Sequence, residues 1–303
     1  AMDATPTMTD ENQDDFLSDA NKGDKKSSLK NSYKVLARKY RPQNFEDLMG
    51  QEIMVQTLKN AFKTNRIAHA YILTGVRGIG KTTTARLLAR SLNYETDLIN
   101  EPNIEMPEIG KHCEEIMESR HIDVIEMDAA SRTGIADIRE IIDSINYSPS
   151  SARYKIYIID EVHMLSKAAF NGLLKTLEEP PAHVKFIFAT TEVQKIPLTI
   201  LSRCQRFDLR RFDNDMIRSL INKVCEKEMV SIDDQIINLI ARASGGSARD
   251  SLSLLDQAMA LSTDGNISEE KIRQMLGMSD QSRVIDLYEY ISNTEIELSL
   301  IHI

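Results

Sequence analysis

The chain has 303 residues, of which 42% are apolar and 27% charged, a composition ordinary for a globular protein with a large core. Its net charge of −9 excludes binding of nucleic acid through bulk positive charge, so any DNA contact must come from a local patch or from helix N-termini. Three scattered cysteines, no apolar run near the ~20 residues of a membrane helix and no signal-peptide pattern predict a cytoplasmic protein without disulfides.

The N-terminal 28 residues are polar and acidic. They hold seven acids and three lysines, so they carry −4 and leave about −5 for the rest. With almost no apolar residues to bury, they are predicted to be a disordered tail. Order is expected to begin near Tyr33, with a mixed segment over Val35–Pro42 that ends in a proline turn. Apolar residues at helical spacing then predict a helix over Ile53–Phe62.

A glycine-rich loop follows a short apolar run, Ala70–Leu73, and precedes helical spacing over Thr83–Arg90. Strand, glycine loop and helix are the context of a P-loop, in which backbone N–H groups converge on phosphate oxygens. Lys81 would reach the β- and γ-phosphates, and the Thr82 hydroxyl would bind Mg²⁺. A chance match is the alternative, and the flanking strand and helix disfavour it. The loop consists of Gly75, Val76, Arg77, Gly78, Ile79, Gly80, Lys81 and Thr82.

Strands and helices alternate as far as Phe212. The predicted elements are a loop over 94–112, a helix over Cys113–Ser119, a strand over Val124–Met127, a helix over Ile135–Ile145, a strand over Lys155–Glu161, a helix over Lys167–Leu177 and a strand over Val184–Thr191. Counting Ala70–Leu73, this gives four strands and predicts a parallel sheet covered on both faces.

Beyond Phe212 the strand signals stop. Three amphipathic helices are predicted over Asp215–Glu228, Ile232–Ala243 and Ala248–Leu261, followed by a short helix over 268–276. Further helices are predicted over Ser282–Ile291 and Glu295–Ile303, and the chain stops inside the second. This predicts a small helical domain and the beginning of a third domain that is cut short.

Three polar residues close two of the predicted strands. Asp160 and Glu161 end a nearly all-apolar strand, where one carboxylate could hold the Mg²⁺ water shell and the other polarise an attacking water. The alternative is a chance acidic pair at a strand end, which the upstream P-loop disfavours. Thr191 ends the next strand and could orient the same water, although a threonine at such a position is more often structural.

Three arginines are further candidates. Arg203 follows a short apolar helix and is either a salt-bridged surface residue or an arginine finger for a neighbouring subunit's γ-phosphate. Arg249, at the start of a later helix, could reach the same nucleotide. Arg132 lies in the turn Asp128–Thr133, where it could meet a DNA phosphate or could simply flank a capped helix.

Taken together, these motifs closely resemble the bacterial clamp-loader ATPases, the gamma/tau (DnaX) family of DNA polymerase III. The resemblance runs from about Tyr33 to about Leu276. The segments that carry it are Ala37–Pro42, Gly75–Thr82, Asp160–Ser166, Leu173–Pro181 and Ser202–Cys204.

The resemblance implies an α/β fold: an AAA+ P-loop NTPase with a parallel sheet flanked by helices, a three-helix lid domain and the start of a helical collar. The implied domains are a nucleotide-binding domain over 29–211, a lid over 212–277 and a truncated collar over 278–303. The implied catalytic residues are Lys81, Asp160, Glu161, Thr191 (sensor 1), Arg203 (a trans-acting finger) and Arg249 (sensor 2). The implied nucleotide-binding residues are Ala37, Arg41, Pro42, Met49 and Gly50 around adenine, and Gly75 to Thr83 around the phosphates, with Thr82 and Asp160 holding Mg²⁺.

The implied function is loading of the sliding clamp onto primed DNA, driven by ATP and Mg²⁺. The implied partners are the delta and delta-prime subunits, further gamma/tau copies, the clamp and primed-template DNA, and no membrane. The family is grouped with DNA-directed DNA polymerase as a holoenzyme subunit without polymerase chemistry of its own. The alternatives are the delta-prime subunit, an AAA+ remodeller acting on protein, and a nucleotide-holding scaffold without turnover. The intact nucleotide motifs disfavour the first and the last.

One departure from the family concerns zinc. The family usually carries a four-cysteine zinc module after the P-loop helix, and here its positions fall on Tyr94, near Pro107 and Gly110, and on Cys113. One cysteine with His112 beside it cannot supply the four ligands of a closed zinc site, so no zinc is predicted. The segment Tyr94–Lys111 is therefore expected to be mobile, with part of it docked on the sheet. The apolar residues available for docking are Leu98, Ile99, Ile104, Met106 and Ile109.

Overall fold

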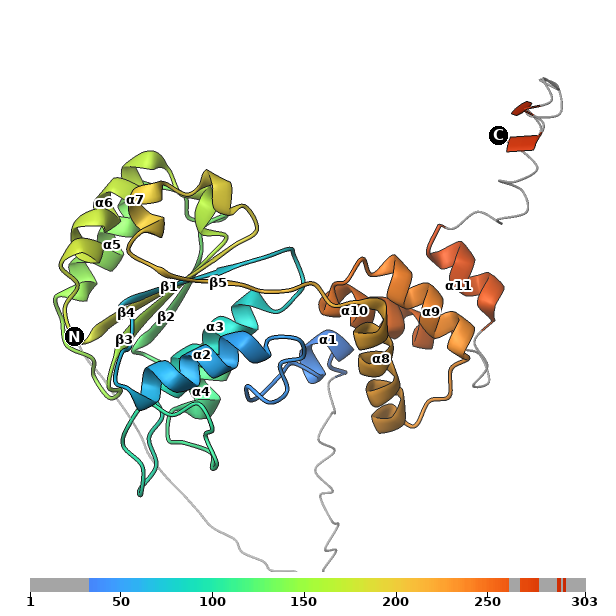
Figure 1. The fold of residues 1–303 in the computed structure, drawn as a ribbon, viewed down its shortest axis with the longest axis horizontal. Coiled ribbons are helices and arrows are strands. Elements are labelled where there is room, and N and C mark those ends of the chain that lie inside the picture. The colour runs from blue at the N-terminus through green and yellow to red at the C-terminus, as the bar shows by residue number, and fades with distance from the viewer. Residues whose placement is uncertain (1–32, 262–267, 278–287, 290, 293–303) are drawn as a thin grey trace, which may run out of the picture. The chain divides into compact units, whose positions relative to one another are not determined.

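The fold is described here from a computed structural model, shown in Figure 1. The structure describes residues 33–261, 268–277, 288–289 and 291–292. The predicted disordered tail and almost all of the predicted collar lie outside these residues. None of the described helices is long and apolar enough to cross a membrane.

A parallel sheet of five strands forms the centre of the N-terminal part. The strands are β1 (Ala70–Thr74), β2 (Val124–Asp128), β3 (Lys155–Asp160), β4 (Val184–Thr190) and β5 (Gln205–Asp208), in the order β2-β3-β4-β1-β5. Every residue of β1 and β4 is buried, which explains why these strands are apolar except for Lys185 and the closing Thr74 and Thr190. The order brings the carboxyl ends of β1, β4 and β3 side by side.

The prediction of four strands was wrong by one. Strand β5 pairs with β1 at the edge of the sheet, and of its four residues only Phe207 is buried. A short edge strand that keeps most of its side chains in solvent has neither the length nor the apolar content that marks a strand in a sequence.

Two groups of helices cover the two faces of the sheet (Figure 1). One group comprises α2 (Glu52–Lys63), α3 (Lys81–Leu92) and α4 (Cys113–Met117), and the other comprises α5 (Ile135–Ile145), α6 (Lys167–Glu178) and α7 (Leu198–Leu201). Each face has its own apolar core, with Leu58 and Leu88 in the first and Ile138 and Leu173 in the second. Burying one such side chain contributes roughly 1.5–3 kcal/mol, so these cores fix the positions of the strand ends.

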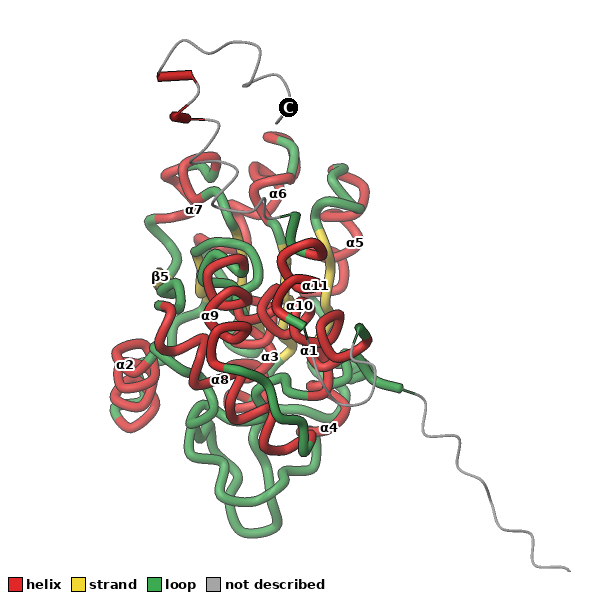
Figure 2. The backbone as a smooth tube through the Cα atoms, turned by 90° about the vertical axis from the view of Figure 1, so that its right-hand side faces the viewer, coloured by secondary structure: helices red, strands yellow, loops and turns green. Residues whose placement is uncertain are grey.

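The remaining helices share a third apolar core. They are α8 (Asn214–Glu228), α9 (Asp234–Ala243), α10 (Ala248–Ala260) and α11 (Glu269–Met275), joined by the short N-terminal helix α1 (Leu36–Lys39). Leu36 of α1 is buried in this core with Ile240 and Leu255. The segment Val35–Pro42, for which the sequence predicts no regular element, is therefore a helical turn packed against helices that follow it by roughly 180 to 220 positions. Figure 2 shows α1 beside α10.

Candidate nucleotide-hydrolysis site

The loop between β1 and α3 has the backbone of an anion-binding turn. Gly75, Gly78 and Gly80 have φ values of 140°, 79° and 98°, a region that side chains disfavour. A Cβ at position 75 would lie 2.4 Å from Ile79 Cδ1 and 2.9 Å from the Leu209 carbonyl oxygen. Glycine is therefore required at this position by both conformation and space.

Lys81 is the first residue of α3 and only 6% exposed. Its ammonium donates hydrogen bonds to the carbonyl oxygens of Gly75 and Val76, each at 3.0 Å. Burial lowers the pKa of Lys81, while the carboxylates of Glu161 and Asp160 act in the opposite direction. A bound phosphate would compete with the two loop carbonyls for this ammonium, which already lies inside the loop.

Thr82 and Asp160 meet across the ends of α3 and β3. The Thr82 hydroxyl donates to Asp160 Oδ2, and the Glu161 backbone N–H donates to Asp160 Oδ1 at 2.9 Å. A hydroxyl and a carboxylate are the hard oxygen donors that Mg²⁺ prefers, so these two residues fit that ion.

Glu161 and Thr191 are also brought together. Glu161 Oε2 accepts hydrogen bonds from the Thr191 hydroxyl at 3.0 Å and from its backbone N–H at 3.3 Å. Glu161 itself has a left-handed backbone with φ of 46°. The carboxylate predicted to polarise water is thus held against the residue predicted to orient that water.

The helical part, formed by α1 and α8 to α11, contacts the P-loop through the start of α10. The Arg249 backbone N–H donates to the Gly78 carbonyl oxygen at 3.1 Å, and a Cβ at position 78 would lie 1.9 Å from Ser247 Oγ. Burial lowers the pKa of Arg41, and the charges of Arg86 and Arg249 lower it further. Two arginines predicted to bind nucleotide, from opposite ends of the chain, therefore lie close enough to repel each other.

The five residues predicted around adenine, namely Ala37, Arg41, Pro42, Met49 and Gly50, are all half-buried. Ala37 packs against the core of the later helices. Gly50 has φ of 71°, and a Cβ there would lie 2.6 Å from Met216 Cε of α8. Ala37 and Gly50, the first and last residues of this predicted set, therefore both lie against the helical part.

Arg203 has different partners. Its guanidinium makes an ion pair with Glu178 at 2.7 Å and donates to the Thr199 carbonyl oxygen at 2.7 Å. About one third of the side chain is exposed. This is the salt-bridged surface arrangement that the sequence left open, and the finger role in a neighbouring subunit stays a prediction.

Two family descriptions match the chain. The family described as "DNA polymerase III, delta subunit" matches residues 50–213, and "DNA polymerase III clamp loader subunit, ATPase lid domain" matches residues 216–264. The DNA polymerase III subunit gamma of Buchnera aphidicola subsp. Schizaphis graminum is 45% identical over 260 residues, which cover 86% of this chain and 70% of the relative.

The chain belongs to the gamma/tau family of DNA polymerase III subunits.

Two longer relatives are also similar. The DNA polymerase III subunit tau of Salmonella typhimurium is 48% identical over 273 residues, and that of Bacillus subtilis is 49% identical over 233 residues. The match covers 42% and 41% of these relatives, so the chain spans about two fifths of their length. Among solved structures, Thermotoga maritima RuvB, titled a Holliday junction branch migration motor, has a TM-score of 0.56 at 19% identity, covering 84% of this chain and 80% of RuvB. This likeness supports the AAA+ fold alone.

Positions that the resemblance assigns to a zinc module come together in the loop over 94–112. A Cβ at Gly110 would lie 3.1 Å from the Tyr94 ring and 3.2 Å from Cys113 Sγ, so three of the four family positions meet. The Tyr94 hydroxyl also donates to the Glu108 carbonyl oxygen at 3.1 Å. The buried Tyr94 ring, with its hydroxyl hydrogen-bonded, thus lies among the positions that the resemblance assigns to zinc ligands. The absence of zinc stays a prediction.

The expected docking of this loop is confirmed in part. Ile104 and Met106 are buried in the core of the α3 face and Ile99 packs against it, whereas Leu98 and Ile109 are 88% and 85% exposed. Figure 2 shows the loop as a long excursion without helix or strand. The sequence could not say which apolar residues would dock, because no periodicity orients them.

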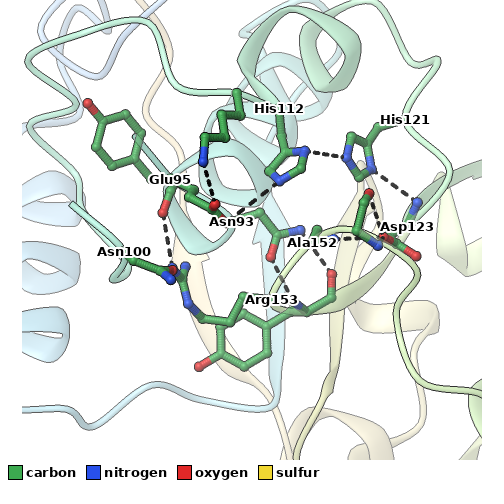
Figure 3. Close-up of polar contacts among 12 residues, drawn as sticks. Asn93, Glu95, Asn100, His112, His121, Asp123, Ala152 and Arg153 are labelled. Atoms are coloured by element: carbon green, nitrogen blue, oxygen red, sulfur yellow. Dashed lines mark hydrogen bonds and ion pairs between the residues drawn. The ribbon is translucent and has the colours of Figure 1, made fainter. Parts of the chain in front are cut away.

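A polar network ties the loop to the sheet (Figure 3). Asp123 donates its backbone N–H to His121 Nδ1 at 3.0 Å, so His121 carries its proton on Nε2, which faces His112 Nδ1 at 2.9 Å. His112 Nε2 in turn faces Glu95 at 4.0 Å. Arg153 donates to Asn100 Oδ1 at 2.5 Å and to the Leu92 carbonyl oxygen at 2.8 Å. Hydrogen bonds therefore link both halves of the loop to the segments that lead into β2 and β3.

Three residues that contact a predicted site residue, or the residue before the P-loop, were not identified from the sequence. Asp208 of β5 accepts a hydrogen bond from Thr74 at the end of β1, and Glu178 pairs with Arg203. His163 lies beside Glu161. Glu178 and His163 stand inside segments that carry the family resemblance, and that position was the only available signal for either residue.

Proposed function

We propose that this chain is the ATP-hydrolysing part of a clamp-loader subunit, which uses ATP to load a sliding clamp onto primed DNA. The observation that carries this proposal is the meeting of Lys81, the Thr82–Asp160 pair and the Glu161–Thr191 pair at three adjacent strand ends. Membership of the gamma/tau family supports it. We infer a nucleotide-binding domain over 29–211, a lid over 212–277 and the beginning of a collar over 278–303.

Each residue has a defined task in this proposal. The P-loop N–H groups and Lys81 bind the phosphates, and Glu161 takes a proton from the attacking water, which Thr191 helps to orient. A magnesium ion, when bound, would neutralise phosphate charge, and Thr82 and Asp160 are the residues that would hold it. Arg203 would act on the nucleotide of a neighbouring subunit.

The link between nucleotide and movement is the contact of α10 with the P-loop. The Arg249 backbone N–H donates to the Gly78 carbonyl oxygen. A change in the conformation of the loop on phosphate binding would therefore shift the start of α10. Arg41 and Arg249 repel each other, and a bound polyphosphate would relieve that repulsion. ATP binding would therefore change the contact between the start of α10 and the P-loop.

The partners proposed for the assembled protein are the delta and delta-prime subunits, further gamma/tau copies, the sliding clamp and primed-template DNA. For the DNA, we propose the turn before α5 as one contact. Its backbone is fixed by Asp128, whose Oδ1 accepts the Ala130 N–H at 2.8 Å, and Arg132 is exposed beside it.

The test is ATP turnover by the complete subunit assembled with the other loader subunits. Primed-template DNA and the sliding clamp together should raise the rate well above the rate with either alone. A protein remodeller would respond instead to an unrelated protein substrate. A rate indifferent to clamp and DNA would contradict the proposed function.

A further inference from the structure

A buried histidine links the proposed catalytic base to the loop after β4. His163 lies in the short 3₁₀ helix η1 (Val162–Met164), and its side chain is 6% exposed. Its Nδ1 is 3.0 Å from the Thr190 hydroxyl and 3.4 Å from Glu161 Oε2. Its Nε2 is 3.4 Å from Glu192 Oε1. Both ring nitrogens thus face carboxylates, one on each side of the histidine.

Glu192, the residue that faces His163 Nε2, is held by two further contacts. Glu192 donates its backbone N–H to Thr190 Oγ1 at 3.0 Å, and its carboxylate pairs with Lys195 at 2.8 Å. Lys195 belongs to the segment that leads into α7, which ends beside Arg203. The histidine therefore connects the end of β3 with the segment that carries the proposed finger.

Glu161 needs such support because its backbone is strained. A non-glycine residue with φ of 46° lies in a region that side chains disfavour, and it persists only where its surroundings hold it. The Thr191 hydroxyl and backbone N–H hold Oε2 from one side, and His163 approaches the same oxygen from another. The hydrogen bonds from Thr191 restrain the rotation of the carboxylate, and the ring of His163, 3.4 Å from the same oxygen, limits the space into which that oxygen could turn.

We propose that His163 is a positioning residue for the hydrolysis reaction: its ring sets the orientation of Glu161 and ties it to Glu192. This inference rests on the proposed ATPase function, in which Glu161 takes a proton from water. A proton acceptor works only within hydrogen-bond reach of the proton, so loss of orientation slows turnover without weakening nucleotide binding.

Four substitutions test this proposal, and two of them replace one ring nitrogen of His163 at a time. His163→Asn places a polar atom where Nδ1 lies, near Glu161 and Thr190. His163→Gln places one where Nε2 lies, near Glu192. His163→Leu removes both, and Glu192→Gln keeps the shape of the far anchor without its charge. Each variant is made in the complete subunit, assembled with the other loader subunits, and compared with the unsubstituted protein.

The measurements are kcat for ATP and the Kd for nucleotide. We expect His163→Leu to lower kcat by about ten-fold, a fraction of the ~10²–10⁴ that a general base contributes, with Kd within about two-fold. His163→Asn should recover most of the loss and His163→Gln less. Glu192→Gln should lower kcat mildly and leave Kd unchanged.

Several outcomes would overturn the role of His163. These are full turnover in the His163→Leu protein, equal turnover in the asparagine and leucine proteins, or a Kd that weakens in step with kcat. If the leucine variant does not fold, the asparagine and glutamine variants decide, because the inference requires asparagine to be faster. An unsubstituted assembly that hydrolyses no ATP would instead contradict the proposed function itself.

Discussion

At the scale of single residues, the phosphate end of the site depends on backbone conformations that most side chains cannot adopt. Gly75 and Gly80 both have positive φ, but their surroundings differ. A Cβ at 75 would meet both a side chain and a backbone oxygen, whereas a Cβ at 80 would have nothing within 4 Å. A side chain at position 80 would therefore cause backbone strain alone, whereas a side chain at position 75 would cause backbone strain and steric overlap.

We expect Gly75→Ala to abolish ATP binding, because the Leu209 carbonyl oxygen cannot move without shifting the end of β5. Gly80→Ala is the matched control, and its cost is limited to backbone strain of about 1–3 kcal/mol. Nucleotide binding measured by titration should be lost in the first protein and weakened in the second. Equal binding by the two proteins would show that the close approach at Gly75 does not shape the loop.

Arg203 carries a second prediction at this scale. Arg203→Ala should leave ATP binding to the isolated chain intact and cut the hydrolysis stimulated by clamp and DNA by about 10³-fold, as for other arginine fingers. Glu178→Gln, which removes only the partner's charge, should have a smaller effect in the same direction. If the isolated chain lost its basal hydrolysis to the same extent, Arg203 would act within its own subunit.

At the scale of elements, the loop over 94–112 is held by a network in which His121 is neutral, because its Nδ1 accepts the Asp123 N–H. Burial lowers the pKa of His121, and the neighbouring His112 lowers it further, against the opposing carboxylates of Asp123 and Glu115. At pH values between the lowered pKa of the folded chain and the ordinary histidine pKa, His121 is therefore protonated in the unfolded chain and neutral in the folded chain. Stability falls as pH drops from that ordinary value towards the lower folded one.

We expect the free energy of unfolding to fall between about pH 7.5 and about pH 5.5, a range that spans the ordinary histidine pKa of ~6.5. His121→Asn keeps an acceptor for the Asp123 N–H but does not titrate, so its unfolding free energy should depend less on pH. Denaturant unfolding at the two pH values measures both. An identical pH dependence in the two proteins would remove His121 as its source.

Helix α1 is the element whose partner is farthest away in sequence. Leu36 is buried in the core of the later helices, while the adjacent Val35 is about half exposed. Leu36→Ala should cost about 2–5 kcal/mol and Val35→Ala well under 1 kcal/mol, because only the first leaves a cavity. Unfolding free energies of the two variants test this, and equal costs would show that α1 does not stabilise the helical core.

Much of this arrangement can be predicted from the sequence. The central strands and long helices carry strong apolar patterns, and the ends of β1, β3 and β4 could be recognised as one site. Strand β5 could not be predicted, because it is short and polar. The contact of His163 with Glu192 joins two loops, and the pairing of Arg203 with Glu178 joins a turn to a helix end. Such pairings depend on tertiary packing, which no local pattern encodes.

At the scale of the whole molecule, the proposed function has the parts of the chain act on one nucleotide. The P-loop, the ends of β3 and β4 and the start of α10 come from positions between Gly75 and Arg249, and each contributes one task. In the proposed function, binding depends on Lys81 and the loop, whereas turnover depends on Glu161. The account therefore predicts that the two activities can be separated by substitution.

The most direct measurement compares Lys81→Ala and Glu161→Gln in the assembled loader, with ATP binding and ATP turnover recorded for both. Lys81→Ala should bind no ATP, because the charge inside the loop is lost. Glu161→Gln should bind ATP as the unsubstituted protein does and hydrolyse almost none, because an amide cannot take the proton from water. Undiminished turnover in the Glu161→Gln protein, or intact binding in the Lys81→Ala protein, would contradict the account.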